Sequence, residues 1–195
     1  MSRKTAAFGI GLLVCVLVSP MLTAAPAPAR SHWDLSVVGG QWTWAGGSNH
    51  APGWTNYRVY GTKGVAAPGN TPGPRAGSVS WTDRGGHVWL FGGSCISGGA
   101  YSYLNDLWKW DGTSWTWVSG SDGVEQQGIY GTKGVAAPGN VPGARSDSAS
   151  WTDANGNLWL FGGIGRSAIS VGPLNDLWKW DGTNWTWVSG SDEVM

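Results

Sequence analysis

Few residues in this 195-residue chain have the type and spacing that catalysis requires. The three histidines, His32, His50 and His87, are far apart in the sequence, so no two of them have the spacing of a metal-binding pair. The sequence also lacks a Ser-His-Asp order, a helix-borne nucleophile and a phosphate-binding loop. It therefore predicts neither an enzyme nor a bound cofactor.

Two carboxylates and one thiol remain to be interpreted. Asp106 and Asp176 each follow an asparagine and lie 70 residues apart. We interpret them as residues that bond to the backbone of a turn, not as an acid and base pair. Cys95 has no His or Lys beside it in the sequence to lower its pKa, so we expect an unreactive loop thiol.

The composition indicates the fold class. The chain contains 33 glycines and 16 tryptophans, while charged residues make up only 12%. Abundant glycine and aromatic residues with few Lys and Glu are typical of short strands and tight turns. The net charge is zero and no basic stretch is present, so we expect no nucleic-acid partner.

The first 25 residues have the order of a secretory signal peptide. Arg3 and Lys4 begin it, an apolar run follows from Ala6 to Val18, and small residues precede Pro26. The apolar run is too short to span a bilayer. We predict that residues 1–25 are removed, that 26–40 form a linker, and that the protein is secreted or in the cell envelope without a membrane span.

The rest of the chain repeats itself with a shift of 70 residues. Residues 60–70 recur unchanged as 130–140, and 89–93 differ from 159–163 at no position. Each unit contains four apolar or aromatic segments bounded by turn residues, in the first unit 78–82, 87–92, 106–111 and 115–119. This pattern predicts a four-stranded antiparallel meander that is apolar on both faces, which favours stacked blades.

The repeated motifs resemble the kelch repeat. Each unit has a strand ending in Leu-Phe-Gly-Gly, a variable loop, Asn-Asp-Leu-Trp, and then Asp-Gly-Thr-x-Trp-Thr-Trp. The resemblance implies an all-β fold of β-propeller blades, with kelch blades at 60–122 and 123–195. Its structural hallmarks would be Gly92, Gly93, Trp110, Trp115, Gly162, Gly163, Trp180 and Trp185.

The number of blades is smaller than a propeller needs. Residues 41–59 begin with Gln-Trp-Thr-Trp and resemble only the fourth strand and loop of a partial first blade. Two blades and one extra strand are fewer than the roughly 4 to 8 blades of a closed ring. We therefore expect an incomplete propeller, either part of a longer repeat protein or a protomer that closes the ring by self-association.

The segments that differ between the two units are the candidates for binding. Segments 94–104 and 164–174 join the second strand to the third, and few of their positions match. Because the scaffold repeats and these loops do not, we expect a protein- or glycan-binding module that acts through its loop face. Twelve of the sixteen tryptophans occupy repeated positions and are interpreted as packing residues. The candidate binding residues are Trp54, Tyr57, Tyr101, Tyr103 and Arg166.

Two alternatives to a binding module remain open. Some secreted kelch-like propellers are copper-dependent carbohydrate oxidases similar to galactose oxidase, a family that uses a cross-linked Tyr-Cys pair, a second tyrosine and two histidines. Cys95 with Tyr101 or Tyr103 would supply the pair here. The other alternative is a truncated repeat fragment without a function of its own.

Overall fold

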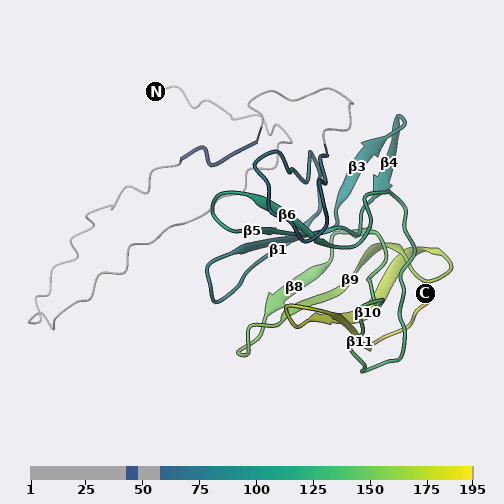
Figure 1. The fold of residues 1–195 in the computed structure, drawn as a ribbon. Coiled ribbons are helices and arrows are strands. Elements are labelled where there is room, and N and C mark those ends of the chain that lie inside the picture. The colour runs from purple at the N-terminus through teal and green to yellow at the C-terminus, as the bar shows by residue number, and fades with distance from the viewer. Residues whose placement is uncertain (1–42, 48–57, 195) are drawn as a thin grey trace, which may run out of the picture.

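The computed structural model describes residues 43–47 and 58–194, and in these ranges the chain is all-β without a helix. Two antiparallel sheets carry the repeat (Figure 1). Blade 1 has the strand order β1-β2-β5-β6. Its strands are β1 (Val79–Thr82), β2 (Val88–Phe91), β5 (Leu107–Trp110) and β6 (Trp115–Ser119).

Blade 2 repeats this arrangement with longer inner strands. Strand β9 pairs with β8 on one side and with β10 on the other, and β10 pairs with β11. The strands are β8 (Ala149–Thr152), β9 (Leu158–Arg166), β10 (Val171–Trp180) and β11 (Trp185–Ser189), with the short β7 (Arg145–Ser146) beside β9. The predicted all-β fold of four-stranded antiparallel meanders is confirmed, and it is consistent with an incomplete β-propeller.

Both segments that we expected to be loops contain strands. Residues 94–103 form a hairpin of β3 (Ser94–Ser97) and β4 (Ala100–Tyr103), and 164–174 extend β9 and β10. The turn of the first hairpin is Gly98-Gly99, with φ of 60° and 82°. Two glycines with positive φ suit a two-residue hairpin turn, so the Gly-Gly pair was an available signal for this hairpin.

The strand register places alternate residues on two opposite faces of each blade. Face A carries the positions of Val79, Trp81, Trp89, Phe91 and Leu107, which in blade 2 are Ala149, Trp151, Trp159, Phe161 and Leu177. Face B carries the positions of Val88, Leu90, Trp108, Trp110, Trp115 and Trp117, which in blade 2 are Leu158, Leu160, Trp178, Trp180, Trp185 and Trp187.

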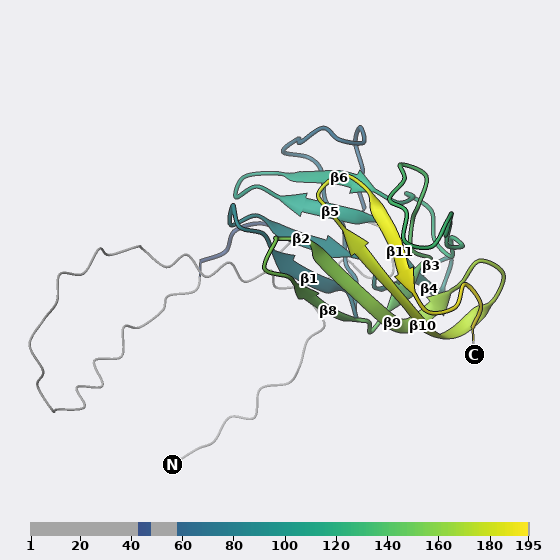
Figure 2. The same cartoon turned by 90° about the horizontal axis from the view of Figure 1, so that it is seen from below.

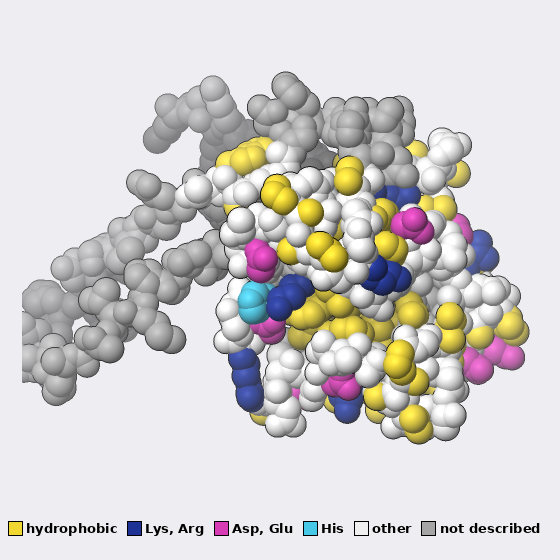
Figure 3. Space-filling view, viewed as in Figure 1, with side chains coloured by type: hydrophobic (Ala, Val, Ile, Leu, Met, Phe, Trp, Pro, Cys, Tyr) yellow, Lys and Arg dark blue, Asp and Glu magenta, His cyan; other side chains and the backbone are white. Residues whose placement is uncertain are grey.

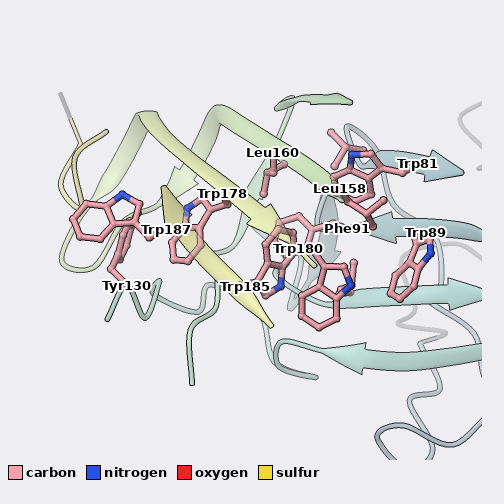
Figure 4. Packing of buried hydrophobic residues seen from close by; sticks show 12 residues of the cluster. Trp81, Trp89, Phe91, Tyr130, Leu158, Leu160, Trp178, Trp180, Trp185 and Trp187 are labelled. Atoms are coloured by element: carbon pink, nitrogen blue, oxygen red, sulfur yellow. The ribbon is translucent and has the colours of Figure 1, made fainter. Parts of the chain in front are cut away.

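Face A of blade 1 packs against face B of blade 2, and this contact is the core of the molecule (Figure 4). The ring centroids of Trp89 and Trp180 are 6.1 Å apart, and those of Phe91 and Trp185 are 5.4 Å apart. The indole Nε1 of Trp81 donates a hydrogen bond of 3.0 Å to the carbonyl of Trp159. Trp81, Trp89, Trp180 and Trp185 are therefore packing residues, as predicted, whereas Trp151, which also occupies a repeated position, is 44% exposed.

The segment that recurs unchanged covers the outer edge of each blade. In residues 60–70, Gly64 N donates to the carbonyl of Trp117 in β6 over 2.8 Å, and Asn70 Nδ2 donates to that of Trp115 over 2.9 Å. The ammonium of Lys63 lies 4.2 Å from the centroid of the Trp117 ring. Residues 130–140 make the same contacts with β11. Because the edge of each outer strand is covered in this way, it is protected from pairing with another strand.

Most of the N-terminal predictions lie outside the described residues. These are the signal peptide at 1–25, the linker at 26–40 and most of the partial blade at 41–59. Of that partial blade, residues 43–47, 58 and 59 are described, and its Thr43 and Trp44 are exposed and belong to no strand. Among the described residues there is also no helix of the length and apolarity that crossing a membrane requires.

Candidate functional site

The two variable hairpins project from the same end of the blades (Figure 2). The β3–β4 hairpin belongs to blade 1 and the tip of β9–β10 to blade 2. The short turns at Asp83 and Asp111 lie at the opposite end, where each carboxylate accepts hydrogen bonds from backbone N–H groups of its own turn. We call the end formed by residues 94–103, 121–126 and 164–174 the loop face.

Glu125 connects the two hairpins of the loop face. Its backbone N donates to the carbonyl of Tyr103 over 2.8 Å, and its Oε1 accepts from Tyr103 N over 2.7 Å. Its Oε2 accepts from Arg166 Nε over 2.7 Å. Glu125 has a φ of 60°, a left-handed conformation that is uncommon for a residue other than glycine. Because this ion pair is about a third exposed, it contributes little stability.

The predicted binding residues on the loop face are only partly brought together. Tyr103 and Arg166 meet through Glu125. Tyr101 lies two residues before Tyr103, on the same face of β4, and 82% of its surface is exposed. Trp54 and Tyr57 lie outside the described residues.

Three exposed aliphatic residues of the loop face, Ile164, Ile169 and Val171, were missed from the sequence. Ile169 and Val171, at the tip of the β9–β10 hairpin, are both exposed. The sequence feature that could have revealed them is the occurrence of β-branched apolar residues in a segment that differs between the two repeat units. Together with Tyr101, they place apolar side chains on both hairpins of this end.

Beneath the hairpins, each blade contains a buried ion pair. In blade 1, Arg75 Nη1 and Nη2 donate to the two carboxylate oxygens of Asp106 over 2.7 and 2.8 Å, and neither side chain is exposed. Tyr60 Oη and Trp108 Nε1 each donate to Asp106 Oδ2 over 2.7 Å. Blade 2 has the same cluster, made of Tyr130, Arg145, Asp176 and Trp178.

The interpretation of Asp106 and Asp176 as backbone-bonding turn residues is therefore wrong. Their partners are side chains, of which the arginine lies 31 residues earlier in each unit. The physical reason is burial, because an aspartate without solvent needs a countercharge that backbone N–H groups do not supply. The recurrence of Tyr, Arg and Asp at the shift of 70 was the signal that could have revealed the cluster.

These contacts fix the protonation states of the cluster. Burial raises the pKa of Asp106, but the charge of Arg75 and the hydrogen bonds from Arg75, Trp108 and Tyr60 outweigh it, so the pKa lies below its ordinary value. The same holds for the pKa of Asp176 with Arg145 as partner. Burial and the neighbouring carboxylate raise the pKa of the Tyr60 and Tyr130 phenols. A carboxylate held ionised and a phenol held neutral stabilise structure and do not exchange protons near neutral pH.

The lowered pKa values predict a loss of stability in acid. A carboxyl group whose pKa is lower in the folded state stabilises that state fully above its unfolded-state pKa of about 3.9, and this contribution is lost as the pH falls through the folded-state value. We expect the free energy of unfolding, measured by urea titration with tryptophan fluorescence, to decrease below about pH 4. The Asp176→Asn variant should show a shallower decrease in this range. Equal slopes in the variant and the wild type would contradict the assignment.

The geometry does not fit the cross-linked Tyr-Cys site that the oxidase resemblance implies. Cys95 pairs across the β3–β4 hairpin with Ser102, whereas Tyr101 pairs with Ile96, so the thiol and the tyrosines are on opposite faces of the hairpin. Burial also raises the pKa of the Cys95 thiol. His87 contacts Asp83 at the far end of the blade, and His32 and His50 are outside the described residues. Within the described part of the chain, no three His, Cys, Asp or Glu side chains form a possible metal site.

In comparisons with protein-family models and with curated protein sequences, no match to this chain was found.

Proposed function

We propose that this chain is a secreted kelch-type propeller, or part of one, that binds a partner protein through its loop face. The observation that carries the proposal is the exposed Tyr101 on a hairpin held in place by Glu125. The two blades beneath share most of their repeated sequence and pack on each other, while the hairpins above them differ in sequence. A variable surface on a constant scaffold is the usual arrangement of a recognition site.

The residues of the loop face favour a protein over a glycan. Tyrosine and arginine are enriched in the cores of protein interfaces, and Tyr101 and Arg166 supply them here. Ile169 and Val171 add exposed aliphatic surface, which buries well against another protein. Figure 3 shows the side of the molecule seen in Figure 1, on which charged side chains of both signs are dispersed.

The test compares binding by the wild type and by variants at the two ends of the blades. The chain is immobilised and exposed to extracellular proteins from its source and, separately, to a glycan array. We expect a protein to be retained, and Tyr101→Ser to weaken its binding by about 2 kcal/mol, or roughly 30-fold, as loss of an interface hot spot does. Thr113→Ala, in an exposed turn at the opposite end, is the matched control and should bind normally. Retention of glycans only, or equal binding by Tyr101→Ser, would refute the proposal.

A further inference from the structure

Among the described residues, the contact between the two blades leaves face A of blade 2 uncovered and face B of blade 1 only partly covered. Face A of blade 1 is covered by blade 2, and its residues Trp81 and Phe91 are 4% and 1% exposed. The equivalent residues on face A of blade 2, Trp151 and Phe161, are 44% and 45% exposed. The same side chains are therefore buried in one blade and open in the other.

Face B shows the reverse difference. In blade 2 it is covered by blade 1, and Trp180 and Trp185 are buried. Their equivalents in blade 1, Trp110 and Trp115, are only partly buried. Each chain thus presents an open face A at blade 2 and a face B at blade 1 that is partly open around Trp110 and Trp115, while Leu90 and Trp108 on that face are buried.

The open faces carry the residues that make the contact inside the chain. That contact joins Trp89 to Trp180 and Phe91 to Trp185. On the open face A, Trp159 and Phe161 are the equivalents of Trp89 and Phe91. On face B of blade 1, Trp110 and Trp115 are the equivalents of Trp180 and Trp185. A surface that already packs on its complement within the chain can pack on the same complement from another molecule.

We infer that face A of blade 2 docks on face B of blade 1 of a second copy of this chain. The contact repeats the one between the two blades and continues the stack from one molecule to the next. This inference rests on the blade contact alone and does not depend on the proposed ligand of the loop face.

Charges do not oppose this docking. Lys179 is the charged residue on the strands of the open face A, and its equivalent Lys109 is accommodated within the intact contact, where its ammonium lies 5.5 Å from the centroid of the Trp89 ring. One rearrangement is required, because Trp151 and Trp159 stack on each other in the open face with centroids 5.8 Å apart and planes at 5°. In the intact contact, Trp81 instead reaches across to the backbone of the other blade.

The docking between copies should be weaker than the contact inside the chain. Two positions are smaller in the open faces, with Ala149 in place of Val79 and Val88 in place of Leu158. Fewer buried methyl groups reduce the hydrophobic contribution. Because the two docking faces differ, the contact is head-to-tail and produces either a closed ring or an open stack. A ring of roughly 4 to 8 blades needs about two to four copies of a two-blade chain.

The decisive experiment uses two variants that block different faces. Phe161→Glu places a charge on the open face A, and Trp110→Glu places one on the open face B. By sedimentation velocity over a wide concentration range, we expect the wild-type chain to associate, either as a discrete oligomer if the ring closes or as a series of species that grows with concentration if the stack stays open. Each variant alone should be monomeric, with association weakened more than about 30-fold. An equimolar mixture of the two variants should form a dimer and nothing larger, because one intact pair of faces remains.

Controls separate loss of docking from loss of folding. Val135 is an apolar residue that is exposed in the described fold, as is its equivalent Val65 in the other repeat unit. The control variant Val135→Glu should therefore leave assembly intact. Urea unfolding checks that each variant is folded, and if Trp110→Glu is not, Val88→Glu replaces it on the same face. A wild-type chain that is monomeric at every concentration would overturn the inference. Normal assembly of Phe161→Glu would also overturn the inference, because face A would then not be part of the contact between copies. Normal assembly of the face B variant would overturn it too, because it would indicate that face A pairs with itself.

Discussion

Replacing Asp176 with asparagine should lower the free energy of unfolding by about 3 to 5 kcal/mol, the range for removal of one partner from a buried ion pair. The Arg145 guanidinium would remain in an interior site without its countercharge, because both side chains are almost fully buried. Tyr130 and Trp178 also donate to this carboxylate, and their hydrogen bonds would weaken when the acceptor loses its charge. Urea unfolding followed by tryptophan fluorescence measures the effect.

Asp181→Asn is the matched control for this prediction. Asp181 is an exposed turn residue whose Oδ1 accepts hydrogen bonds from the backbone N atoms of Thr183 and Asn184, and an asparagine side chain can accept the same bonds. We expect its replacement to change the stability by less than about 1 kcal/mol. The double variant Arg145→Met with Asp176→Leu should recover much of the loss, since an apolar pair leaves no buried charge. Equal effects of Asp176→Asn and Asp181→Asn would show that the buried pair has no special importance.

Replacing Gly93 with alanine should destabilise the fold by about 2 to 5 kcal/mol, from the combined costs of left-handed backbone strain and steric overpacking. Gly93 has a φ of 96°, and a Cβ there would lie 2.2 Å from Ser78 Oγ and 2.8 Å from the carbonyl oxygen of Ala76. The serine side chain can move away, but the Ala76 carbonyl belongs to the backbone and accepts a hydrogen bond from Ser94. The steric conflict therefore cannot be relieved without disturbing the start of the β3–β4 hairpin.

Gly112→Ala separates the two causes of this effect. Gly112 has a φ of 98°, almost the same as that of Gly93, but a Cβ there would meet nothing within 4 Å. Its replacement should cost only the strain of the left-handed conformation, about 1 to 2 kcal/mol. The difference between the two variants, measured by urea unfolding, gives the cost of crowding alone. Gly163→Ala and Gly182→Ala repeat the comparison in blade 2, with φ of 96° and 98°. Equal losses at Gly93 and Gly112 would contradict the packing role of the glycine doublet.

Local features of the sequence determined the strands and their order. Alternating aromatic residues between Gly, Asn and Asp turns were enough to predict four-stranded meanders, because strand alternation and turn geometry depend on residues only a few positions apart. The end at which the two variable segments project also followed from the sequence, since successive antiparallel strands place alternate connections at opposite ends. That 94–103 and 164–174 are hairpins was missed, although Gly98-Gly99 indicated the first of them.

The tertiary structure decided which distant residues meet. Arg75 and Asp106 are 31 residues apart, and no local rule pairs them. The joining of Tyr103 and Arg166 by Glu125 likewise depends on how the two blades are placed. Phe91 and Phe161 lie in identical five-residue segments, yet one is buried and the other open, because only one of them faces another blade. A repeated sequence specifies the same strand twice, and the neighbour across the face determines whether that strand belongs to a core or to a surface.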